Sequence, residues 1–182
     1  MAFNLFGKKE KNRPRGVFTD KTYVSTNAKM NACVDLAKID PATVFITWFS
    51  ETTRNFKAMF EQHGIAGSRI IEARQLHAAL LSGKTAVFGE HHPLHNKEIE
   101  LVENLTQDHF LVFSAMDEPL FKHFGSEKMI QLMNLMGMKE EESIEHPLVS
   151  RSIIKGQEKI AAQLNVEFAA NSQAEWMERN IK

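Results

Sequence analysis

The sequence predicts an α/β fold: a mostly parallel sheet of about five strands with helices on both faces, followed by a helical C-terminal segment. Up to Ser114, short apolar runs alternate with stretches of helical spacing, which is typical of parallel sheets with right-handed crossovers. The run TVFITWF at 43–49 is continuously β-branched and aromatic, as strands buried on both faces are. Beyond Ser114 only helical spacing continues.

Each expected strand is a short apolar run, and the segments between runs carry apolar residues three and four positions apart. Ser25, Thr26 or Asn27 can cap the first helix, and Gly64 can end the second. The expected strands are 21–26, 43–49, 68–73, 84–90 and 109–114, and the expected helices are 27–38, 50–63, 74–83, 96–105, 129–136 and 148–164. These elements divide the chain into a flexible basic tail (1–19), an α/β domain (20–116) and a helical extension packed on it (117–182).

Composition excludes several classes of protein. The 43% apolar content of 182 residues suffices for a sizeable core, and a net charge of −1 gives no electrostatic reason to expect nucleic acid as a partner. One cysteine, Cys33, excludes an internal disulfide framework and fits a reducing compartment. No apolar run approaches the roughly twenty residues of a membrane span. We therefore expect a cytoplasmic protein.

The N-terminal tail combines apolar and basic residues. Phe3, Leu5 and Phe6 precede a basic stretch that starts with Lys8 and Lys9. Such a segment can touch an anionic membrane, because each cation near the surface adds on the order of 1 kcal/mol. A solvated chain end is the alternative, since the apolar part is too short to anchor a protein alone. Membrane contact is expected to be peripheral at most.

The motif GEHHPLH places Glu90, His91, His92 and His95 directly after an expected strand. Two histidines four positions apart on a helix can share a zinc ion. Pro93 lies between His91 and His95 and disfavours an unbroken helix there, and the spacing matches no established zinc motif. A polar loop at a strand end is the preferred interpretation, and a metal site is the alternative.

No other local motif indicates a catalytic or cofactor-binding site. The fragment GKT at 83–85 lacks the leading glycine of a phosphate loop and runs into a strand, so we interpret it as a turn. The histidines show no signature of a Ser/His/Asp or Cys/His arrangement. Ligands in parallel α/β folds gather at the carboxyl ends of the strands. Here those ends carry Ser50, Arg74, residues 90–92 and residues 114–117.

A methionine-rich stripe follows the last expected strand. Met129, Leu132, Met133 and Met136 share one face of a helix. Such a stripe is usually core packing, and methionine also serves surfaces that must adapt to a partner. The candidate interaction surface consists of Phe121, Phe124, Met129, Met133 and Met136.

The segment FSAMDEPLFKHFGSEKMIQLMNLMGMKEEESIEHPLVSRSIIKGQEKI at 113–160 resembles the SecA family, the ATPases that drive preproteins through the bacterial translocon. The matching positions are Ser114, Asp117, Glu118, Leu120, Phe124, Gly125, Ser126, Glu127, Met133, Gly137, Ile144, Glu145, His146, Ile153, Gln157 and Lys159. A weaker resemblance extends back to about residue 20, including the segment at 42–65. It implies a helicase-like second motor lobe of the P-loop NTPase type, with the start of the SecA scaffold helix.

The departures from the family are as informative as the matches. In SecA, this lobe supplies arginine fingers and a nucleotide-sensing loop. The present chain has no arginine between Arg74 and Arg151, and NKEIELVENL stands in place of the finger helix. An arginine finger contributes about 10³–10⁵ to the rate of phosphoryl transfer. The resemblance therefore implies a degenerate lobe without a phosphate loop, which should not hydrolyse ATP.

Three functions remain open from the sequence. The first is a non-catalytic interaction module linked to protein translocation, without a cofactor, whose partner is a full-length SecA or another translocon component. The second is a regulator that binds a nucleotide without hydrolysis, through Arg74, Lys84 or the histidine loop. The third is a metal-dependent enzyme that uses the GEHHPLH motif.

Overall fold

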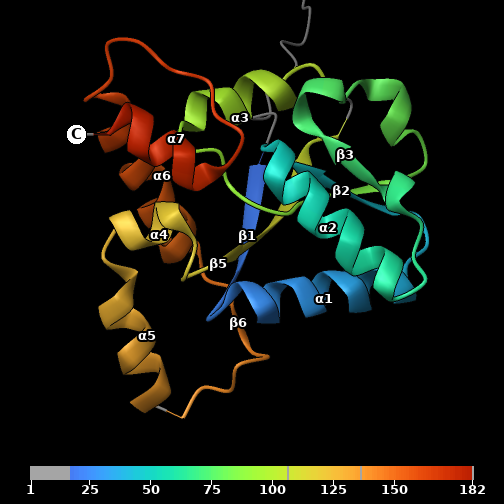
Figure 1. Ribbon diagram of the computed structural model, residues 1–182, viewed down its shortest axis with the longest axis horizontal. Helices are drawn as coiled ribbons and strands as arrows, with labels where there is room; N and C mark the ends of the chain where they lie inside the picture. The colour runs from blue at the N-terminus through green and yellow to red at the C-terminus, as the bar shows by residue number, and fades with distance from the viewer. Residues whose placement is uncertain (1–16, 106, 136, 182) are drawn as a thin grey trace, which may run out of the picture.

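The structure is a computed structural model that describes residues 17–105, 107–135 and 137–181. Its strands form one sheet in the order β3-β2-β4-β5-β1-β6 (Figure 1). Every neighbouring pair is parallel except β1 and β6, which are antiparallel. The expected α/β class with a mostly parallel sheet is therefore confirmed. The strands are β1 (Val17–Tyr23), β2 (Thr43–Thr47), β3 (Ile70–Glu72), β4 (Thr85–Phe88), β5 (His109–Ala115) and β6 (Ser143–Ile144).

Helices cover both faces of the sheet and continue past the carboxyl ends of its parallel strands (Figure 1). The α-helices are α1 (Thr26–Ile39), α2 (Ser50–Gln62), α3 (His95–Val102), α4 (Pro119–His123), α5 (Ser126–Leu135), α6 (Pro147–Ala161) and α7 (Gln173–Asn180). Short 3₁₀ helices are η1 (Gly67–Arg69), η2 (Ala73–Gln75) and η3 (Ala78–Leu81). The buried apolar residues of α1 and α2 pack on one face of the sheet, and those of α3 and η3 pack on the other.

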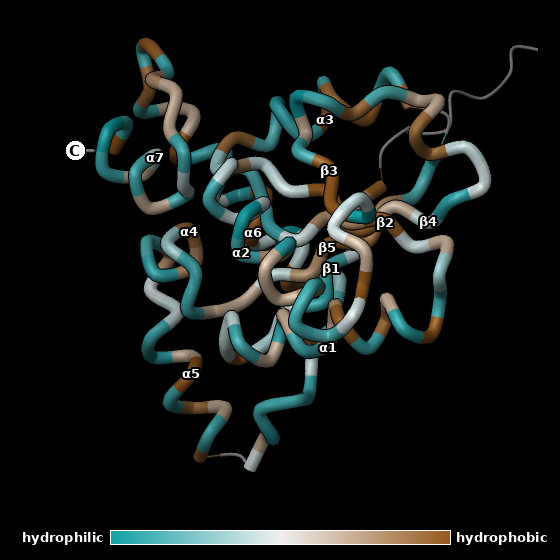
Figure 2. Tube along the Cα trace, turned by 45° about the vertical axis from the view of Figure 1, so that its right-hand side comes forward, coloured by the Kyte–Doolittle hydropathy of each residue, from teal (hydrophilic) through white to brown (hydrophobic). Residues whose placement is uncertain are grey.

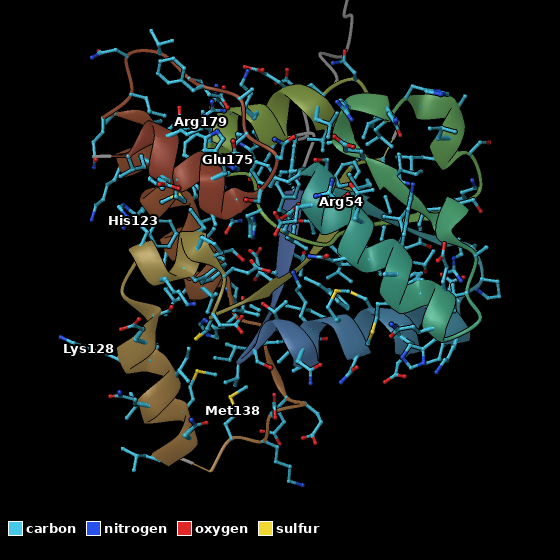
Figure 3. All side chains as sticks on the ribbon, in the orientation of Figure 1. Arg54, His123, Lys128, Met138, Glu175 and Arg179 are labelled. Atoms are coloured by element: carbon cyan, nitrogen blue, oxygen red, sulfur yellow. The ribbon has the colours of Figure 1, made fainter. Side chains whose placement is uncertain are left out.

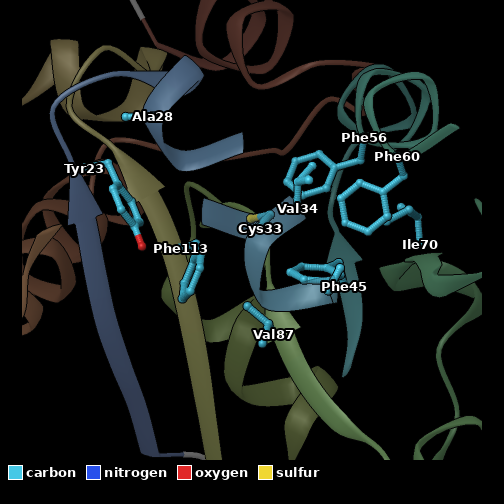
Figure 4. Close-up of a cluster of buried hydrophobic side chains, with 11 residues drawn as sticks. Tyr23, Ala28, Cys33, Val34, Phe45, Phe56, Phe60, Ile70, Val87 and Phe113 are labelled. Atoms are coloured by element: carbon cyan, nitrogen blue, oxygen red, sulfur yellow. The ribbon is translucent and has the colours of Figure 1, made fainter. Parts of the chain in front are cut away.

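The first face is an aromatic core between β2, β5 and the helices α1 and α2 (Figure 4). Phe45 of β2 meets Phe60 of α2 edge to face, with ring centroids 5.1 Å apart. All five residues of β2 are buried, as predicted from its continuous apolar run. Ser25 caps α1 by accepting a hydrogen bond from the main-chain N–H of Ala28 (3.1 Å), which confirms one of the three expected caps.

The second face packs Phe88 of β4 and Phe110 of β5 beneath α3. Trp48 stacks on Phe88 with ring centroids 5.7 Å apart, and Val102 of α3 is fully buried. Hydrophobic residues run through these central strands in Figure 2. Both faces are closed, so the edge formed by the strand ends is the remaining place for a site.

Three details differ from the expected elements. The strand β1 begins at Val17, so the expected tail 1–19 overlaps it by three residues, and the buried polar residues of this strand concealed it. Segment 74–83 is not one helix: Leu76 and His77 are extended between η2 and η3, and Leu76 packs against the second face. The strand β6, only two residues long, was not expected after Ser114 and pairs with the end of β1.

The C-terminal extension packs on the carboxyl edge through a separate apolar cluster. Leu120 and Phe121 of α4, Ile153 and Ile160 of α6, and Trp176 of α7 are buried together. No helix in the described ranges is long and apolar enough to cross a membrane. The membrane contact expected for Phe3, Leu5, Phe6, Lys8 and Lys9 concerns residues outside these ranges.

Candidate functional site

The GEHHPLH loop lies at the carboxyl end of β4 and is buried rather than open. Glu90, His91 and His92 are each less than a tenth exposed. The elements that contact the loop include the start of α2, the start of α3 and the C-terminal helices α6 and α7. This loop is therefore the centre of the carboxyl edge, and its contacts decide what the edge can bind.

His91 lies between two buried carboxylates. Its Nε2 is 2.7 Å from Oδ1 of Asp20 in β1, and its Nδ1 is 2.9 Å from Oε1 of Glu98 in α3. Burial alone would lower the pKa of His91, but the charge of Glu98 and the hydrogen bonds with both carboxylates raise it to about 10. For Asp20 and Glu98 the signs are reversed. Burial alone would raise their pKa values, but the hydrogen bonds with His91 and its charge lower both. The imidazolium donates from both ring nitrogens and joins β1 to α3.

Glu90 connects the loop to the start of α2. Its Oε1 accepts hydrogen bonds from the main-chain N–H groups of Trp48 (2.9 Å) and Phe49 (3.2 Å), and its Oε2 accepts from the hydroxyl of Thr52 (2.8 Å). The carboxylate therefore caps the N-terminus of α2, where the helix dipole favours negative charge. Burial raises the pKa of Glu90 to about 7, although the charge of Lys29 opposes this shift.

Lys29 of α1 is buried beside the loop. Its ammonium donates to the carbonyl oxygen of Gly89 (2.6 Å) and is ion-paired with Glu118. Burial opposes the charge on this lysine, but the nearby carboxylates of Glu118 and Glu90 raise its pKa. Both buried cations at this edge, His91 and Lys29, are paired with carboxylates of the protein.

His92 is enclosed by aromatic rings. It stacks on Phe49 with centroids 5.9 Å apart and meets Trp48 and Trp176 edge to face. Its Nδ1 accepts a hydrogen bond from the main-chain N–H of Leu94 (3.0 Å). Burial lowers its pKa, so the ring is neutral and serves as part of the apolar cluster.

Two glutamines attach the C-terminal helices to this loop. Gln157 of α6 donates from Nε2 to the carbonyl oxygen of His92 (2.7 Å). Gln173 of α7 donates to the carbonyl oxygen of His91 (3.0 Å), and its Oε1 accepts from the main-chain N–H of Leu120 (2.8 Å). The chain's own C-terminal helices therefore occupy the space where a ligand of a parallel α/β fold would lie.

The histidines of the alternative metal-site interpretation are engaged in other contacts. Both ring nitrogens of His91 contact carboxylates, and Nδ1 of His92 accepts from the backbone. Across the described ranges, no three His, Cys, Asp or Glu side chains are arranged to hold a metal ion. The polar-loop interpretation of GEHHPLH accounts for all of these contacts.

The residues considered for nucleotide binding do not converge. Arg74 follows β3, is largely exposed and pairs with Glu72 (2.8 Å). Lys84 precedes β4 and therefore lies at the opposite edge of the sheet from His91, which follows that strand. The hydroxyl of Ser114 lies 3.1 Å from that of Thr22 and is buried.

A further residue at this edge, Asp117, acts at the start of α1. Its Oδ1 accepts hydrogen bonds from the main-chain N–H (2.8 Å) and the hydroxyl (2.6 Å) of Thr26. Ser50, the first residue of α2, has its hydroxyl 3.4 Å from Oδ1 of Asn171 in the α6–α7 connection. These polar side chains hold helices in place.

The predicted interaction surface is only partly exposed. Phe121 and Met133 are buried, and Phe124 is half-buried, so these side chains pack inside the protein. Met129 is 49% exposed, and Met136 lies outside the described residues. The prediction that the candidate interaction surface is exposed was wrong for Phe121 and Met133. Phe121 of α4 and Met133 on the inner side of α5 are buried against neighbouring elements.

The exposed apolar side of α5 consists of Met129, Leu132 and Leu135, called here the α5 ridge. Leu132 is 50% and Leu135 is 85% exposed. These three positions, each three residues apart, line one flank of the helix. Sequence reasoning placed Leu132 on the methionine-rich stripe but left it out of the candidate interaction surface. It missed Leu135, although the spacing of three from Met129 and Leu132 was a usable signal.

The helix α5 extends away from the body of the molecule (Figure 1). Among the described residues, its inner side belongs to a small apolar cluster with Val24, Met116, Met138 and Ile144. Met138 lies beside α5 where the chain turns back toward β6 (Figure 3). A helix held by so few apolar contacts presents its outer flank to solvent.

Comparison with known proteins finds relatives for part of this chain. No protein-family model matches it. The SecA of Acidithiobacillus ferrooxidans and that of Methylococcus capsulatus are each 43% identical to it over 51 residues, and the SecA of Orientia tsutsugamushi is 36% identical over 59. Part of the chain is related to SecA. The matched segments cover 28–32% of this chain and 6–7% of those relatives, so what is shared is a short segment of a SecA protein.

Proposed function

We propose that this SecA-related chain is a non-catalytic interaction module that acts in bacterial protein translocation by binding a full-length SecA. The observation that carries this proposal is the closed carboxyl edge. Gln157, Gln173 and Trp176 of the C-terminal helices fill the place where a ligand of a parallel α/β fold would bind. A module whose ligand edge is closed acts through its outer surface.

The charge pattern supports a role without catalysis. Phosphoryl transfer needs a phosphate cradle, a metal ion and cationic groups on the transferred oxygens. The chain has no arginine between Arg74 and Arg151, and Lys84 lies at the far edge of the sheet from the histidine loop. The buried Lys29 is already paired with Glu118. These residues offer no convergent cationic site for a triphosphate.

The α5 ridge is the surface that we assign to the partner. Its three apolar side chains are exposed on a helix that projects from the body. Alternating hydrophobic and hydrophilic residues along α5 are visible in Figure 2. An exposed apolar helix flank suits a partner that supplies an apolar groove. The relation to proteins named protein translocase subunit SecA supports SecA as that partner.

Binding of the purified full chain to purified full-length SecA, measured by fluorescence anisotropy, tests the proposal. Saturable binding is expected. The double variant Leu132→Ala/Leu135→Ala should weaken it by about tenfold or more, because a buried leucine side chain contributes about 1.5–3 kcal/mol. The matched control Glu127→Ala/Gln131→Ala changes the polar flank of the same helix and should bind like the wild type. Absence of binding, or equal losses in both variants, would overturn the proposal.

A further inference from the structure

A second surface lies between α3, the end of α6 and the α6–α7 connection. It is an open cavity of about 650 Å³, called here the α3–α6 groove. Its apolar lining includes Leu94 and Ile99 from the α3 side, and Leu164 and Val166 from the far side. Val166 is 64% exposed and Ile99 and Leu164 are half-buried, whereas Leu94 is buried at the base of the lining. A groove of this size can accept several apolar side chains.

The rim of the groove is acidic. Glu100, Glu103, Glu158 and Glu167 all line it. Lys97 beside it pairs with Glu100 (3.9 Å) and Glu167 (3.6 Å). Glu103 and Glu158 are exposed and make no ion pair within the described ranges. The groove therefore suits an occupant that combines apolar side chains with positive charge.

The first described residue of the chain lies next to this groove. Val17 and Phe18 line a smaller cavity of about 180 Å³ between β1, α3 and α6. His95 and Gln157 line both this cavity and the α3–α6 groove. The described part of the chain therefore begins at the side of the molecule that carries the groove.

Residues 1–16 have the composition that the groove requires. Phe3, Leu5 and Phe6 are apolar, and the basic residues that follow them are Lys8, Lys9, Lys11, Arg13 and Arg15. Five cations and one acid, Glu10, give this segment a formal charge of +4. An extended chain spans up to about 3.3 Å per residue, so the apolar residues can reach the full length of the groove from Val17.

We propose that residues 1–16 of this chain dock in its own α3–α6 groove. The apolar residues Phe3, Leu5 and Phe6 contact the lining, and the basic residues lie against the glutamates of the rim. The proposal does not depend on SecA binding, because the groove is separate from the α5 ridge. It gives the N-terminal segment a position on the protein instead of on a membrane.

Intramolecular photo-cross-linking of the full chain tests this docking. A benzoyl group on the ring of Phe6 should cross-link to the peptides that carry Ile99, Leu164 and Val166, as identified by mass spectrometry. The same group at Ile39, which is 81% exposed on α1 at the other face of the sheet, should give no such product. Added salt should lower the yield from Phe6, because exposed charges are screened.

Charge exchange separates docking from chance proximity. The variant Glu103→Lys/Glu158→Lys should lower the cross-link yield about fivefold, because it replaces two attractions between exposed charges by repulsions. Adding Lys8→Glu/Lys9→Glu to that variant should restore the yield. Cross-links outside the groove, between two copies of the chain, or only to anionic phosphatidylglycerol vesicles would overturn the proposal. A yield that the rim variant leaves unchanged would also overturn it.

Discussion

The side-chain amide of Gln173 in α7 donates a hydrogen bond to the carbonyl oxygen of His91, across 82 positions of sequence. The same side chain accepts from the main-chain N–H of Leu120, the second residue of α4. One fully engaged amide thus joins the C-terminal helix, the histidine loop and the helix that follows β5. The C-terminal extension and the α/β domain form one packed unit, and the ligand edge is closed from within.

Replacing this amide should destabilise the whole chain. Gln173→Ala leaves a buried carbonyl oxygen and a buried N–H unpaired, and each such loss costs roughly 1–3 kcal/mol. Urea unfolding should show a decrease in the free energy of unfolding of about 2–4 kcal/mol. The control Glu178→Gln lies on the exposed side of α7 and should change this free energy by less than about 0.5 kcal/mol. An unchanged midpoint for Gln173→Ala would contradict the closed edge.

A close approach at the end of β4 leads to a second prediction. A Cβ atom on Gly89 would lie 2.6 Å from the ring of Phe56, which is fully buried. Gly89→Ala should therefore destabilise the protein by about 1–3 kcal/mol through overpacking. Phe56→Leu should recover part of that loss in the double variant, which a double-mutant cycle would detect.

Gly67 provides the control for this prediction. A Cβ atom there would meet its nearest neighbours at 3.5 Å, which is an ordinary contact. Gly67→Ala should therefore leave the free energy of unfolding unchanged or slightly higher, because alanine restricts the unfolded chain. Equal destabilisation at both glycines would show that the contact with Phe56 has no special effect.

The fold could be predicted further than the site. The apolar run of β2 and the helical spacing of α1 and α2 are local signals, and all three elements form as expected. The strand β1 was placed late because Asp20 and Thr22, polar residues inside it, are buried by partners far away in sequence. The network at the carboxyl edge depends on such distant pairs, so no local pattern in the sequence reveals it.

Stability should fall with rising pH through the titration of His91. Its pKa is raised from 6.5 in the unfolded chain to about 10 in the fold. The imidazolium therefore stabilises the fold fully below about pH 6.5, and this contribution is lost between there and about pH 10. In urea unfolding between these limits, the wild type should lose stability more steeply than His91→Gln.

Direct titration of the ring gives an independent reading of the same prediction. In the folded wild-type chain, the NMR chemical shifts of His91 should remain those of an imidazolium at pH 8, whereas in the urea-unfolded chain they should be those of the neutral ring. A His91 ring that loses its proton near pH 6.5 would contradict the pairing with Asp20 and Glu98.

The single cysteine should be almost inert in the native protein. Cys33 is fully buried in the core of the first face, and burial raises the pKa of its thiol to about 12. The thiolate is the reactive form, so a disulfide reagent should modify Cys33 only at the rate at which the fold opens. Rapid modification without denaturant, at the rate of a free thiol, would contradict the packing of α1 on the sheet.

Calorimetric titration with nucleotide tests the central claim, that the ligand edge is closed and the chain is non-catalytic, most directly. The purified, untagged full chain is titrated with ADP, and separately with ATP and Mg²⁺. The account predicts no binding heat up to millimolar nucleotide, because Gln157, Gln173 and Trp176 occupy the edge. The buried cations at this edge, His91 and Lys29, are already paired with carboxylates of the protein. Saturable binding in the micromolar range would contradict it and make a nucleotide-binding regulator the better description.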